Sequence, residues 1–339
     1  MGAKSFFFVF SVILSSCFTW HSVGHMLVAE IAKQRLQKFE PETLTWVEEI
    51  INPLKYFCGE GDFPMVEGST WPDRIIRDDW TQMFNWHFLD KVFKEESFKT
   101  SKSKYNEGDV INDQENVIWA INSIKKVLET KITERTHFHN NPLLGKSLSM
   151  RNLIHFIGDL HQPLHSSTRV SDKLPNGDSG GNLFIIDLYG PDKPKAWNNL
   201  HFIWDHMFDL YDQSLNVPIT KDQYSMLQLW ANELQDEHKY ENLKHKLVKN
   251  SRPEDWAQES FNLVNSLLYK NIKENQKLPK WYWEMGQRIV KERITLAGYR
   301  LADMMHEIRV NLKKKDQESY SKINKKNSKG FSNGREIIF

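Results

Sequence analysis

The sequence predicts an all-α protein, a single mainly helical domain with a small β-hairpin. Most segments longer than ten residues repeat apolar residues at the three- and four-residue spacing of a helix face, and long alternating patterns typical of strands are scarce. Hydrophobic residues make up 40% of the 339 residues and charged residues 26%, so the chain can bury a core.

The helices are expected in the following order. Apolar residues from Val28 to Leu36 and from Val117 to Leu128 fit one face of a helix. Further helices are predicted at 147–161, 198–211, 222–236, 254–272 and 284–312, with loops at 56–72, 94–112 and 166–181. The best strand candidate is Asn182 to Leu188, which follows a glycine-rich turn.

The ends of the chain differ from this domain, which we expect at residues 20–310. Residues 1–19 have a lysine, a nine-residue apolar run and then small residues, which predicts a cleaved signal peptide rather than a transmembrane segment. The alternative is a short buried N-terminal helix. A signal peptide implies a secreted or lumenal, vesicular protein. Residues 311–339 carry eight Lys/Arg against three acids and are expected to form a disordered basic tail, either solvated or touching polyanions.

Composition excludes two classes of protein. Lys+Arg is 45 and Asp+Glu is 44, so the chain is not a bulk polycation that holds nucleic acid by net charge. Cys17 and Cys58 are the only cysteines, which excludes a disulfide scaffold. No stable protein partner is inferred.

Histidines and aspartates gather in a few short motifs. His155 and Asp159 are four residues apart, as are His201 and Asp205, so each pair projects from one face of a helix. Imidazole and carboxylate are suitable zinc ligands. One such pair is more often a surface pair or a buried, capped histidine, but several pairs together favour a metal centre. Cleavage before Trp20 would add a free α-amine, which binds metal once deprotonated.

Eight short motifs follow one another along the chain: WHSVGH (20–25), STWPD (69–73), WHFLD (86–90), HFIGDLHQPLH (155–165), GDSGGN (177–182), NLHFIWD (199–205), WAQES (256–260) and LAGYRLA (296–302). Together they resemble the trinuclear-zinc type I nuclease family, which includes fungal single-strand nucleases, plant bifunctional nucleases and trypanosomatid 3′-nucleotidase/nucleases. Zinc phospholipase C belongs to the same superfamily. The resemblance covers essentially all of residues 20–305.

The resemblance implies three zinc ions. The first would be held by Asp73, His87, His155 and a bridging Asp159, and the second by the amine and carbonyl of Trp20 with His25 and Asp159. The third would be held by His165, His201 and Asp205. In such clusters the paired ions lie about 3.5–4 Å apart and share a water whose pKa falls to near 7. A hydroxide bridging the two ions would attack phosphorus and release 5′-nucleotides.

The resemblance also assigns roles to four other residues. Asp90 would orient the attacking water, and Phe88 would stack on a nucleobase, which favours single-stranded RNA and DNA. Asn182 would contact the substrate. The family usually has Lys or Arg at the position of Ile76. Arg77 is the candidate replacement for this cation. On a helix, however, the Arg77 side chain would point about 100° away from the direction of residue 76.

The expected activity is therefore a secreted zinc-dependent single-strand endonuclease, with 3′-nucleotides as further substrates. Two alternatives remain open at this point. One is a zinc phospholipase C-like lipid phosphodiesterase, although that enzyme's last metal pair resembles His-x-x-x-Glu, where this chain has His201 and Asp205. The other is an inactive zinc-stabilised binding protein, which the Ile76 departure favours.

Overall fold

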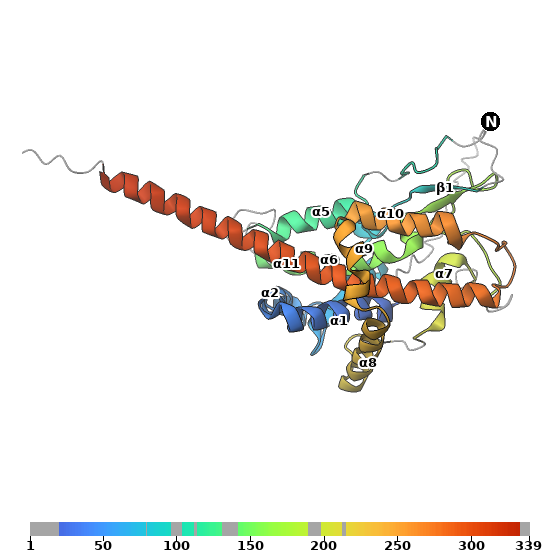
Figure 1. Ribbon diagram of the computed structural model, residues 1–339, viewed down its shortest axis with the longest axis horizontal. Coiled ribbons are helices and arrows are strands. Elements are labelled where there is room, and N and C mark those ends of the chain that lie inside the picture. The colour runs from blue at the N-terminus through green and yellow to red at the C-terminus, as the bar shows by residue number, and fades with distance from the viewer. Residues whose placement is uncertain are drawn as a thin grey trace, which may run out of the picture.

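The structure, a computed structural model, describes residues 20–78, 80–95, 104–111, 114–130, 142–188, 198–211 and 215–332. Within these residues it is mainly helical, as the sequence predicted (Figure 1). The α-helices are α1 (Ser22–Phe39), α2 (Pro41–Ile51), α3 (Pro64–Glu67), α4 (Trp71–Arg77), α5 (Val117–Leu128), α6 (Pro142–His161), α7 (Leu200–Asp205), α8 (Lys221–Glu237), α9 (Tyr240–Lys249), α10 (Pro253–Leu263) and α11 (Lys280–Ser332). Short 3-10 turns are η1 (Asn52–Leu54), η2 (Gly68–Thr70), η3 (Thr81–His87), η4 (Pro163–Ser166) and η6 (Met207–Asp209), and a π-turn, η7 (Val264–Leu268), extends α10. The predicted signal peptide lies outside the described residues.

Helices α1 and α6 form the centre of the domain. Every residue of α1 from Val23 to Ala32 is buried, and so is every residue of α6 from Met150 to His161. Helix α11 packs against α1 at Gly298, where a Cβ atom would lie 2.5 Å from Ile31 Cγ2. Because these stretches of α1 and α6 are buried, their histidines and acids must find partners inside the protein.

The sheet differs from the expected β-hairpin. Strand β1 (Val92–Lys94) pairs in parallel with β2 (Thr168–Val170), with Val92 opposite Thr168. The predicted strand from Asn182 to Leu188 is wrong, because only an isolated bridge between Ile185 and Asn199 forms there. Its first residues are held in a turn instead: the amides of Asn182 and Leu183 donate to the carbonyls of Ser179 and Asp178.

The predicted helix over 198–211 is shorter in the structure. Helix α7 ends at Asp205, and Met207, Phe208 and Asp209 have φ angles of 53–54°. These left-handed residues turn the chain so that the Phe208 ring packs against Gly286 of α11, a position with no room for a side chain. The helices predicted near 222–236 and 254–272 correspond to α8 and to α10 with η7.

Helix α11 is longer than expected. It continues to Ser332, through most of the segment predicted to be a disordered tail, and projects beyond the other helices (Figure 1). Lys, Glu and Gln in this segment are good helix formers. The first part is also tied to the domain, since Arg309 and Lys313 each lie 3.0 Å from Glu42 and Lys315 lies 3.2 Å from Glu129. Among the described residues, every helix is too short or too polar to cross a lipid bilayer.

Candidate metal centre

Helix α6 supplies the central pair of the site. His155 and Asp159 lie one turn apart, and His155 Nε2 is 3.3 Å from Asp159 Oδ2. His155 Nδ1 donates to the Ser69 carbonyl in η2 at 2.6 Å. This hydrogen bond fixes the ring orientation, so that Nε2 points toward the acids, as in histidines that bind metal through one nitrogen.

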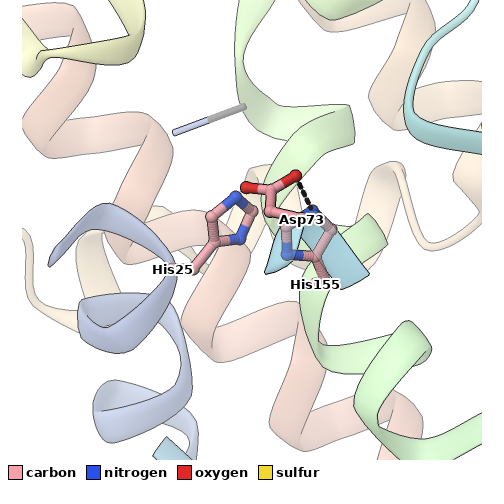
Figure 2. Close-up of side chains that lie close together, drawn as sticks. All are labelled: His25, Asp73 and His155. Carbon is pink, nitrogen blue, oxygen red and sulfur yellow. Dashed lines mark ion pairs between the residues drawn. The ribbon is translucent and has the colours of Figure 1, made fainter. Parts of the chain in front are cut away.

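Three other elements complete this first cluster. Asp73 on α4 lies 3.3 Å from His155 Nε2, and His87, at the end of η3, places Nδ1 2.9 Å from Asp159 Oδ2. His25 on α1 lies 3.3 Å from Asp159 Oδ1 and stacks on His155 at 3.8 Å between ring centroids. Figure 2 shows Asp73 directed toward the ring nitrogen of His155, with His25 facing both. Residues far apart in the sequence therefore meet in one buried cluster.

Gly158 allows His25 to approach α6. A Cβ atom on this glycine would lie 2.7 Å from His25 Nδ1. The carbonyl of Gly158 also accepts a 2.8 Å hydrogen bond from the Trp20 indole. Since the amide of His21 donates to the Asp205 carbonyl at 2.9 Å, the main chain after Trp20 is held beside both groups of acids.

A second cluster contains His165, His201 and Asp205. The Nε2 atoms of the two histidines lie 3.6 and 3.2 Å from the Asp205 carboxylate. Both Nδ1 atoms donate to carbonyls, His165 to His87 and His201 to Gly180, each at 2.8 Å. The His165 bond to the His87 backbone connects this cluster to the first.

The carboxylates of the first cluster favour positive charge on His155 but not on His25. Burial alone would lower the pKa of His155, but Asp159 and Asp73 outweigh burial and raise it to about 10. Burial and the nearby His155 lower the pKa of His25 to about 4. Burial would raise the pKa of Asp73, but His155 and His87 lower it to about 2. The carboxylates of Asp73 and Asp159 thus attract positive charge to the side of His155 that faces them.

The donor chemistry fits metal ions. In the second cluster the histidine Nδ1 atoms carry the protons, so the Nε2 atoms and the Asp205 carboxylate all face one another as acceptors. His165 Nε2 and Asp205 Oδ2 are buried and make no hydrogen bond within the described part of the chain. Ligand atoms lie within 4.8 Å of one another in three groups: His25, Asp73 and His155; His87, His155 and Asp159; His165, His201 and Asp205. A divalent cation would satisfy these acceptors.

The residues predicted to act on substrate lie around these clusters. Phe88 follows His87 in an extended conformation and contacts Phe84 edge-on at 5.4 Å. Burial raises the pKa of Asp90 to about 7, Asp178 adds to the effect, and His201 and His165 oppose it. The Asn182 side chain donates to the Ser179 carbonyl at 2.8 Å, in the turn whose Gly180 holds His201.

Arg77 is exposed at the end of α4, one helical turn after Asp73. Residues four apart on a helix share a face, so Arg77 projects from the same side as Asp73. Burial and the nearby His206 lower the pKa of His21, next to Trp20, Asp205 opposes them, and the charge of Arg77 adds a smaller lowering. Arg74 is directed elsewhere, because it donates to the Cys58 carbonyl at 2.9 Å. Of these two arginines, Arg77 is therefore the one that lies on the same side of α4 as Asp73.

Several residues that shape the site were not predicted. Gln162 donates to Asp205 at 2.8 Å, and Asp178 accepts from the Gly181 and Arg169 amides, which fixes the turn beside His201. Ser69 contributes its backbone carbonyl, which accepts the hydrogen bond from His155. Gly158 contributes space for His25, because it has no side chain. All four lie within the motifs STWPD, HFIGDLHQPLH and GDSGGN, which is the signal that could have found them.

The fold and the buried histidine and aspartate groups define a helical protein with candidate sites for several metal ions, an arrangement suited to hydrolysis of phosphate esters. A family model for the S1/P1 nuclease matches residues 20–309, so the chain belongs to this nuclease family. Endonuclease 4 of Arabidopsis thaliana is 27% identical over 309 residues, covering 88% of this chain and 92% of that protein. Endonuclease 3 of the same plant is 24% identical over 311 residues, covering 88% and 92%, and Endonuclease 5 is 23% identical over 316 residues, covering 88% and 94%.

Proposed function

We propose that this protein is a zinc-dependent nuclease that hydrolyses single-stranded RNA and DNA to 5′-nucleotides and also removes phosphate from 3′-nucleotides. The observation that carries the proposal is the convergence of two buried clusters, connected by the hydrogen bond from His165 to the His87 carbonyl. Imidazole and carboxylate groups this close together are suitable ligands for zinc ions.

The metal ligands proposed for the paired ions are Trp20, His25, Asp73, His87, His155 and Asp159, and those for the third ion are His165, His201 and Asp205. Bound zinc would supply positive charge that lowers the pKa of a water and neutralises phosphate oxygens. The buried ligands hold their geometry through the Ser69, His87 and Gly180 carbonyls, so little reorganisation accompanies catalysis.

The remaining roles are those that the resemblance to the family implies. Asp90, whose charge interacts with His165 and His201, orients the attacking water without binding metal. Phe88 stacks on a base, an interaction worth about 1–3 kcal/mol that accepts any base. Arg77 stabilises the transition-state phosphate in place of a cation at Ile76, and Asn182 contacts the substrate.

The central experiment measures hydrolysis by the purified, zinc-loaded protein. We expect single-stranded RNA and DNA to be cleaved faster than duplexes of the same sequence, and the products to carry 5′-phosphates. Removal of zinc with a chelator should abolish hydrolysis, and addition of zinc should restore it. Cleavage of phosphatidylcholine micelles without cleavage of RNA or DNA would show that the substrate class is wrong.

We further propose that the protein is secreted or enters a vesicular compartment, with cleavage directly before Trp20. The α-amine of Trp20 then becomes a zinc ligand. N-terminal sequencing of natively exported protein should therefore begin at Trp20. A variant with one extra Met before Trp20 should lose one zinc ion per chain and nearly all activity. Full metal content and activity in that variant would rule out the amine as a ligand.

A further inference from the structure

The segment that joins η3 to β1 presents two different faces. Phe88 has extended dihedral angles, and β1 begins at Val92. Between them the Lys91 amide donates to the Leu89 carbonyl at 2.9 Å, which closes a three-residue turn with Asp90 at its centre. Asp90 interacts with the charges of His165 and His201 on the side of the metal centre, whereas Leu89 and Lys91 line a pocket with residues of α5 and α10.

This pocket has a volume of about 470 Å³, within the range of small-molecule sites, and lies between α5 and α10, which run beside each other in Figure 1. Leu89 and Val110 make part of an apolar wall. The Trp119 ring stands at one side, 41% exposed, and contacts Trp86 at 5.5 Å between ring centroids. A planar ligand in the pocket would stack on the Trp119 ring, which the contact with Trp86 holds in position.

The rim of the pocket carries polar groups. The Lys91 ammonium donates to Gln258 Oε1 at 2.5 Å, lies 4.9 Å from the centre of the Phe261 ring and interacts with the charge of Glu107. Glu254 is also on the rim and accepts a hydrogen bond from Asn122 at 3.0 Å. An aromatic wall, one cation and hydrogen-bonding groups together match a ligand with a heteroaromatic ring and a phosphate.

We propose that this pocket binds a nucleotide, with its base against Trp119 and its phosphate at Lys91. The proposal rests on the proposed function, which supplies nucleotides in two forms. One is the released 5′-nucleotide, and the other is a nucleotide of the strand being cleaved, several positions away from the metal centre.

A ligand in this pocket would contact the segment from Phe88 to Lys91, because Leu89 and Lys91 line the pocket. The Leu89 amide donates to the His165 carbonyl at 2.7 Å, and the Val117 amide at the start of α5 donates to the Phe88 carbonyl at 3.2 Å. The Lys91 carbonyl accepts from the Thr168 amide at 2.9 Å. Because these bonds position Phe88 and His165, we expect a bound nucleotide to change the turnover rate as well as substrate affinity.

The test uses the full zinc-loaded chain and two variants, Trp119→Leu and Lys91→Gln. Isothermal titration with 5′-AMP should show two sites per chain, one of which weakens at least about tenfold in each variant, the size expected from loss of one stacked base in Trp119→Leu and of one charged hydrogen bond in Lys91→Gln. Trp281→Leu and Lys280→Gln are matched controls, because both residues are exposed at the start of α11 and neither lines this pocket. Lys91→Gln keeps the test valid should Trp119→Leu fail to fold.

A second arm identifies the source of the nucleotide. If the strand supplies it, 5′-AMP binds only once, and both variants raise KM for a hexanucleotide about tenfold but leave KM for a dinucleotide unchanged. A single 5′-AMP site in the native chain, with oligonucleotide kinetics unaffected in both variants, would overturn the proposal. Titration with 5′-AMP requires no turnover, so a protein that binds it twice but cleaves no RNA or DNA would count against the proposed function alone.

Discussion

Replacing Gly158 by alanine should disable the metal centre with little effect on the rest of the domain. The new Cβ would lie 2.7 Å from His25 Nδ1, whereas ordinary contact begins at 3.4 Å, so the His25 ring must withdraw by 0.7 Å. His25 cannot easily turn aside, because it is stacked on His155 and contacts Asp159. Metal–ligand distances tolerate changes of only about 0.2 Å.

We therefore expect Gly158→Ala to lose one zinc ion per chain and about 100-fold in nuclease activity, the loss that a misplacement of this order causes. Unfolding free energy should change less, since overpacking costs about 1–3 kcal/mol and alanine regains about 1 kcal/mol of helix propensity. The measurements are metal content by atomic absorption, urea denaturation and cleavage of single-stranded DNA.

Gly298→Ala provides the matched control. It also adds a Cβ to a buried helical glycine, here 2.5 Å from Ile31, but at the packing of α1 on α11 and not at the clusters. This variant should be destabilised to a similar extent and keep all its zinc. Full zinc content and native activity in Gly158→Ala would refute the role assigned to this close approach.

Three other predictions concern separate parts of the molecule. Asp90→Asn should keep three zinc ions but lose most activity, and unchanged turnover would remove Asp90 from the mechanism. Arg77→Ala should cost about 2–3 kcal/mol of transition-state binding, the loss typical of one oxyanion donor, measured as kcat/KM on a dinucleotide. At Glu259, burial would raise the pKa, but the hydrogen bond from Arg300 and the charge of Arg293 outweigh it and hold the pKa well below 4.5. The carboxylate thus stabilises the fold above about pH 4.5, and this contribution is lost as pH falls toward the lowered pKa. Glu259→Gln should cost about 3–5 kcal/mol at pH 7 and flatten the acid end of the unfolding profile measured in urea.

The sequence predicted the helical class and several of its elements, because apolar spacing is a local property. Spacing also indicated the pairs His155–Asp159 and His201–Asp205, which the structure brings within 3.3 and 3.2 Å. Joining these pairs to Asp73 and His87 depended on the resemblance to a family, since nothing in local spacing says which distant segments meet.

Other features were beyond local pattern. The parallel pairing of β1 with β2 is a contact between segments 76 residues apart, as from Val92 to Thr168, and three-residue strands leave no clear alternation. The turn after α7 arises from left-handed residues without a glycine, so no turn signal precedes Phe208. Composition also misjudged 311–332, because charged residues that suit a solvated coil are equally good helix formers.

The residues of the first cluster come from α1, α4, η3 and α6, and those of the second from η4 and α7. Long stretches of intervening chain must therefore be in place before either group is complete. A polypeptide still emerging from the ribosome, or one that has lost a single one of these elements, has no assembled centre. Any activity that depends on these clusters therefore requires the chain from α1 to α7 to be folded.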